Sequence, residues 1–154
     1  MLNHRLSPKT YANFYDYWLT FGGKQGNFIE DILIVALLKE PCWNLKHLNF
    51  SDIPKNLVLA KKEIKGKRIV LVRNNTKSFD ANNLTFKNLP AGSKCSAFIV
   101  YVDKGHANKS PLLFYVGEES AWGLPVFFGQ REAFFSDSVT IGWDNNINRI
   151  WNYG

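Results

Sequence analysis

The first periodic pattern of apolar positions lies near the beginning of the chain. Apolar residues recur there at the i, i+3, i+4, i+7 spacing that forms one stripe along an α-helix, at Tyr11, Phe14, Tyr15, Trp18 and Leu19. Ser7 can cap the helix and Pro8 suits its first position, whereas Gly22 and Gly23 would end it. The pattern predicts an α-helix over residues 8–21 whose aromatic face packs on a sheet.

After this segment the chain changes to short runs of β-branched and aromatic residues. Residues 29–38 are almost continuously apolar, which favours a central strand covered on both faces, although periodicity alone leaves a buried helix open. Residues 41–56 are rich in Pro, Asn and Asp and predict an irregular connection. Further strands are predicted at residues 57–64, 67–72, 84–86, 96–103, 112–116, 138–143 and 147–151.

This spacing of short strands and turn-forming residues is typical of a sandwich or barrel. The 154 residues suit one hydrophobic core, and aromatic residues reach 15%, which favours strands and contact surfaces. We therefore expect one domain over residues 1–154, mainly β, built as an antiparallel β-sandwich with one N-terminal α-helix.

Positive charge is concentrated in one part of the chain. The net charge is +6, and the segment from Lys55 to Lys77 is rich in lysine and arginine and has Glu63 as its only acidic residue. We define the basic patch as Lys61, Lys62, Lys65, Lys67 and Arg68. We expect these residues to lie on one β-hairpin. Such a patch could attract a polyanion or an acidic protein surface, or it could simply be a solvated surface. Residues 55–77 contain no aromatic residue on which bases could stack, so a nucleic-acid-binding β module is a lesser alternative.

Catalytic and metal-binding motifs are missing from the sequence. It has no Gly-rich phosphate loop, nucleophile elbow, His-Glu-x-x-His or Cys-x-x-Cys motif. Cys42 and His47 could supply two zinc ligands, but the sequence offers no second pair at a suitable spacing. Both cysteines, Cys42 and Cys95, are expected to be buried, reduced thiols. The adjacent Glu118 and Glu119 would point to opposite faces of a strand. We expect a non-enzymatic protein with no catalytic residues, metal or cofactor.

Paired phenylalanines mark a candidate contact surface. Neighbouring side chains on a strand alternate between its faces, so one member of each pair needs cover from elsewhere. The predicted intersubunit interface comprises Phe127, Phe128, Phe134, Phe135 and Trp122. Exposed tryptophans could instead serve as platforms for a carbohydrate.

Several short hydrophobic blocks, each ending in a turn, follow one another in a characteristic order. They are Asp31–Leu38, Phe50–Pro54, Phe79–Phe86, Ala97–Lys104, Lys109–Tyr115, Gly123–Val126, Val139–Asn145 and Arg149–Trp151. Over residues 10–151 this order resembles a family of small structural proteins of tailed bacteriophages and prophages. The chain departs from the family at residues 118–136, where relatives have a short polar turn, and at residues 40–50, where relatives are small and polar.

The resemblance implies a virion protein that is made in the cytoplasm of a bacterial host. Such a protein acts through repeated copies of one interface. We expect a capsid-decorating or head-associated subunit, with a tail, neck or baseplate component as the alternative. The implied partners are the major capsid or tail proteins and symmetry copies of the chain itself. Nucleic acid is not expected as a partner, because the basic segment lacks aromatic residues. A membrane is not expected either, because no apolar stretch approaches the length of a membrane span.

Overall fold

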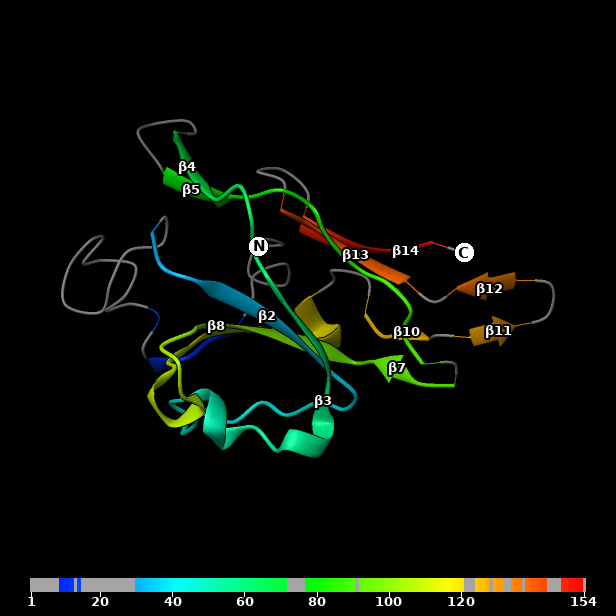
Figure 1. Cartoon of the computed structure of the whole chain (residues 1–154), viewed down its shortest axis with the longest axis horizontal. Coiled ribbons are helices and arrows are strands. Elements are labelled where there is room, and N and C mark those ends of the chain that lie inside the picture. The colour runs from blue at the N-terminus through cyan, green and yellow to red at the C-terminus, as the bar shows by residue number, and fades with distance from the viewer. Residues whose placement is uncertain are drawn as a thin grey trace.

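The protein is seen in a computed structural model that describes residues 9–12, 14, 30–71, 77–90, 92–120, 124–127, 129–131, 134–136, 138–143 and 148–153. The described chain is mainly β, and its strands pair in the antiparallel sense (Figure 1). The predicted mainly-β class and antiparallel pairing are therefore confirmed.

The largest sheet has five strands in the order β1-β9-β8-β2-β3. Its strands are β1 (Lys9–Thr10), β9 (Leu112–Val116), β8 (Ala97–Val102), β2 (Leu33–Leu38) and β3 (Val58–Glu63). Strand β2 lies between β8 and β3, and five of its six side chains are buried, since only Ile34 is partly exposed. The predicted central strand is confirmed, but it begins at Leu33 because Glu30 and Asp31 form a turn and a bend before it.

The other strands form smaller sheets. Strand β13 (Ser138–Trp143) lies between β14 (Asn148–Tyr153) and β6 (Leu84–Phe86). Three two-stranded sheets pair β4 (Arg68–Leu71) with β5 (Lys77–Asp80), β7 (Lys94–Cys95) with β10 (Val126–Phe127), and β11 (Gly129–Arg131) with β12 (Phe134–Ser136). Short 3-10 helices are η1 (Phe50–Asp52), η2 (Lys55–Leu57), η4 (Ala107–Lys109) and η5 (Glu118–Ser120).

The five-stranded sheet is covered on both faces by apolar side chains. One face shares a buried cluster with β6 and β13, in which Phe98 meets Trp143 edge-to-face at 6.0 Å between ring centroids. In Figure 1, β13 and β14 accordingly lie over β2 and β8. The other face carries a second cluster around Tyr11 and Tyr115, and the irregular connection after β2 covers it with Trp43. Burial on both faces explains why β2, β8 and β9 are apolar throughout.

The beginning of the predicted N-terminal helix is wrong. Lys9 and Thr10 form β1 and pair with Tyr115 and Phe114 of β9. The Tyr11 N–H then donates to the Leu113 carbonyl oxygen of β9 at 2.9 Å. Pairing with the sheet edge therefore overrides the local capping signal. Backbone of helical geometry occurs at residues 12 and 14, and the other residues of the predicted helix, 8, 13 and 15–21, lie outside the described residues.

Candidate docking surface

The basic patch does not lie on one hairpin. Strand β3 pairs with β2, whereas β4 pairs with β5 in a separate sheet. The chain leaves the five-stranded sheet at Ile64, whose N–H donates to the Leu33 carbonyl oxygen at 2.9 Å, and Gly66 turns it at a φ of 66°. The expected hairpin was wrong because β3 finds a more apolar partner in β2, which precedes it in the chain.

Four of the five side chains of the basic patch contact oxygen atoms of the chain itself. Lys62 Nζ donates to the Thr85 carbonyl oxygen at 2.5 Å and so links β3 to β6. Lys65 forms an ion pair with Glu63 at 3.0 Å, and Arg68 donates to a carbonyl oxygen of its own turn at 3.0 Å. These donors are therefore partly occupied within the fold.

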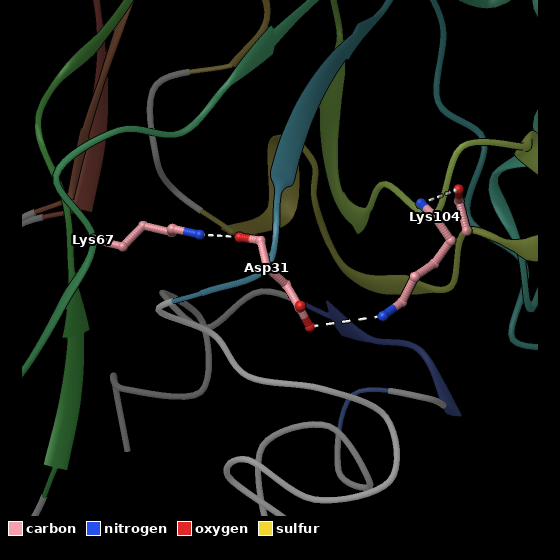
Figure 2. Close-up of polar contacts among 4 residues, drawn as sticks. Asp31, Lys67 and Lys104 are labelled. Atoms are coloured by element: carbon pink, nitrogen blue, oxygen red, sulfur yellow. Dashed lines mark hydrogen bonds and ion pairs between the residues drawn. The ribbon is translucent and has the colours of Figure 1, made fainter.

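Lys67 belongs to a polar junction at the beginning of β2 (Figure 2). Its Nζ donates to the main-chain carbonyl oxygen of Asp31, and the Asp31 carboxylate lies 3.8 Å from Nζ of Lys104. Figure 2 shows the two lysines reaching Asp31 from opposite sides. Desolvation lowers the pKa of Lys67 below its ordinary value, although the carboxylates of Glu63 and Asp31 oppose that shift. The junction joins β2, the approach to β4 and the loop between β8 and β9.

Lys61 lies on the opposite face of β3 from these contacts. The pairing of β2 with β3 shifts register at Leu59, so that β3 has one extra residue there. As a result Leu59 and Ala60 both pack on the large core, whereas Val58 and Lys61 lie on the other face. Lys61 Nζ lies 5.4 Å from the ring centroid of Phe50, within reach of a cation–π interaction.

An apolar groove follows this face of β3. Its volume is about 410 Å³, and its lining includes Phe50, Ile53, Lys55, Val58, Lys61 and Ala107. The Phe50 ring stacks on Tyr101 of β8 at 4.1 Å with an interplanar angle of 10°. The groove therefore has a fixed aromatic wall and two ammonium groups among its lining residues. We call this groove, together with β3, the β3 surface.

Asp52 fixes the turn that carries Phe50. One oxygen of its carboxylate accepts the N–H groups of Leu48 at 2.8 Å and Asn49 at 3.1 Å. These two hydrogen bonds favour the charged form and lower the pKa of Asp52 below its ordinary value. The turn is therefore held by an anion at the N-terminal end of η1.

Replacing Asp52 by asparagine is expected to remove part of the acid sensitivity of the fold. A lowered folded-state pKa gives stability that is present above the unfolded-state pKa, about 4, and is lost as pH falls through the folded-state value. Asp52 is exposed, so we expect a loss of less than about 1 kcal/mol at pH 7. Thermal unfolding between pH 2 and pH 7 measures it, with exposed Glu40→Gln as control. An unchanged acid limb in the Asp52 variant would contradict the assignment.

The predicted aromatic interface is described only in part. Phe127 is 42% exposed, and Lys94 Nζ lies 5.9 Å from its ring centroid. The backbones of Phe134 and Phe135 pair with Arg131 and Gln130 in the β11–β12 ribbon. Outside the described part lie the other features of this interface, namely Trp122, Phe128 and the side chains of Phe134 and Phe135. The exposed Phe127 side chain is available for an intersubunit contact, but the structure contains a single subunit, so this contact stays a prediction.

Two of the residues weighed for catalysis or metal binding make structural contacts. Glu118 and Glu119 lie in η5, and Glu119 forms an ion pair with Lys9 at 3.0 Å. The main-chain N–H of Cys42 donates to the Tyr115 hydroxyl at 3.2 Å. Within the described ranges, no three His, Cys, Asp or Glu residues are grouped as metal ligands would be.

The groove itself was not predicted from the sequence. Its main aromatic wall, Phe50, comes from residues 41–56, which were correctly expected to be irregular. An aromatic residue between Asn49 and Asp52, in a run of turn-forming residues, was the available signal that this connection packs on the sheet.

No protein-family model, curated protein or solved structure matches the chain. In the part of the chain that the structure describes, no helix is both long and apolar enough to cross a membrane.

Proposed function

We propose that the protein is a non-enzymatic structural subunit of a tailed-phage particle, located in the virion as a capsid-decorating or head-associated component. A tail, neck or baseplate component is the alternative. The observation that carries the proposal is the β3 surface, where an aromatic wall and an apolar groove lie beside Lys55 and Lys61. An aromatic anchor site with a charged rim is the usual anatomy of a protein interface. The ordered blocks that resemble phage structural proteins support the same class.

The proposal includes a β-sandwich as the architecture of this subunit. Support comes from the cluster that the five-stranded sheet shares with β6 and β13, including the contact of Phe98 with Trp143. Two packed sheets give a rigid body whose surface can be repeated across a particle.

Nucleic-acid binding is less well supported than protein docking. Lys62, Lys65 and Lys67 direct their ammonium groups to oxygens of the chain itself, and the patch divides between two sheets. We expect weak binding to duplex DNA at physiological salt, measured by fluorescence anisotropy at two salt concentrations. Tight binding that falls steeply with salt would favour a role in contact with the genome.

Particle composition tests the proposed function directly. Particles of the phage or prophage that carries the gene for this chain would be produced in its bacterial host, purified on a density gradient and analysed by mass spectrometry. We expect the chain to co-purify with the major capsid protein, and cryo-electron microscopy of the same particles to place it on the head or on the tail. Absence from particles, with the chain present in the soluble lysate, would refute the structural role.

A further inference from the structure

Strand β3 has an unpaired side. It is the last strand of the five-stranded sheet, and no described strand pairs with it opposite β2. The hydrogen bond from Ile64 to Leu33 fixes the alternation of the ladder, so Ala60 and Lys62 bond toward β2. The main-chain N–H and C=O groups of Lys61 and Glu63 therefore point away from the sheet.

The charge on this side disfavours a second copy of the same chain. Lys61, Lys62 and Lys65 lie on or directly after β3, and lysines on an edge strand resist pairing with an equally basic strand. An acidic segment reverses the sign of that interaction. Lys55 and Lys61 are both exposed, and neither has a carboxylate partner among the described residues.

The groove lies directly beside the unpaired side. Val58 and Lys61 belong to β3 and also line the groove, because the bulge at Leu59 turns both to that face. An added strand would run along β3 with alternate side chains over this face. One of them could enter the groove beside Phe50, while a neighbouring carboxylate on the same face meets Lys61 or Lys55.

We propose that the β3 surface binds an extended acidic segment of a partner protein, which pairs with β3 as a sixth strand and places one apolar side chain in the groove. This is recognition by strand addition, in which main-chain hydrogen bonds give affinity and a side-chain pocket gives selectivity. The inference rests on the proposed function only in taking the partner to be another particle subunit.

A short peptide tests the docking without a particle. The probe is a fluorescent six-residue peptide, the length of β3, with the sequence Glu-Glu-Leu-Val-Glu-Glu, so that each face of the added strand carries one apolar side chain flanked by glutamates. Binding to the full chain is measured by fluorescence anisotropy at low and physiological salt. We expect saturable binding that Lys61→Glu and Lys55→Glu each weaken about tenfold, which corresponds to 1.4 kcal/mol.

Matched controls separate strand addition from general attraction to a basic protein. Lys87→Glu makes the same change of charge at an exposed residue between β6 and β7, and should change binding less than twofold. A peptide with N-methyl groups on its two central residues, whose N–H groups point to opposite edges of the strand, keeps its charge but cannot complete the ladder whichever edge meets β3, and should not bind. Equal losses for Lys61→Glu and Lys87→Glu, or unchanged binding of the methylated peptide, would overturn the proposal.

Amide hydrogen exchange gives a readout that does not depend on affinity. With saturating peptide, the amides of Lys61 and Glu63 should become protected, whereas those of Ala60 and Lys62, already bonded to β2, should change little. Circular dichroism of each variant checks that it is folded. Peptide binding without incorporation into particles would refute the virion role alone, and incorporation without peptide binding would refute the docking mode alone.

Discussion

Replacing Phe98 with alanine is expected to lower the free energy of unfolding by about 3–5 kcal/mol. Phe98 is fully buried on β8, and its ring meets Trp143 of β13 at an interplanar angle of 88°. Truncation removes the ring from the interior and leaves a cavity between two hydrogen-bonded sheets that cannot close freely. The residue thus reports whether the two sheets share one core.

Urea denaturation measures this loss, with Phe50→Ala as a matched control. Phe50 undergoes the same truncation at a partly exposed position on the other face, so its loss should be smaller. Phe98→Leu keeps most of the volume and should cost less than about 1.5 kcal/mol, which provides a folded variant if Phe98→Ala does not fold. Equal losses for Phe98→Ala and Phe50→Ala would contradict the shared core.

The two cysteines are expected to differ at least about a thousandfold in their reactivity toward a thiol reagent. Cys95 is fully buried in β7, and its Sγ donates to the Ala97 carbonyl oxygen at 3.2 Å. Burial raises the pKa of Cys95 to about 12, so only about one thiol in ten thousand is a thiolate at pH 8. Cys42 is partly exposed, so the reagent can reach it, although burial raises its pKa too.

Absorbance after addition of Ellman's reagent at pH 8 follows both thiols. We expect one fast thiol in the folded protein, none in Cys42→Ser, and full reaction of Cys95 only after unfolding in guanidinium. The Cys95→Ser variant should keep the fast phase. Two thiols that react at the same rate in the folded state would show that β7 does not hold Cys95 in the interior.

Regular strands were predictable because their signal is local. Strands β6 and β9 match the predicted residues 84–86 and 112–116, and β8 and β13 differ by at most one residue at each end. These runs are apolar throughout, as in β8 and β9, or place an apolar residue at every second position, as in β6 and β13, so the residues themselves show which segments enter a sheet. Strands β1, β5, β7, β10, β11 and β12 were missed because they have only two to four residues and, unlike β6, do not have apolar residues at alternate positions.

Pairing was less predictable than strand location. Lys65 and Gly66 suggested a hairpin between β3 and β4, but β3 pairs with β2 across the irregular connection. The candidate docking site depends on this choice, because pairing with β2 leaves the other side of β3 open and places a bulge at Leu59. The basic charge was visible in the sequence, but its division among an ion pair, carbonyl contacts and a groove was set by tertiary contacts.

The strand order also governs how the chain can fold during synthesis. Strand β2 can pair with β3 once Glu63 has been made, but its other neighbour, β8, begins only at Ala97, and β1 awaits β9 at Leu112. The entropy cost of closing such long loops comes before the stabilising contacts form. We therefore expect a folding time of milliseconds to seconds, as is typical of all-β chains. Meanwhile the apolar face of β2 is unprotected on the ribosome. A nascent chain stalled before residue 97 should therefore aggregate or recruit a chaperone, whereas one released after residue 116 can complete the five-stranded sheet.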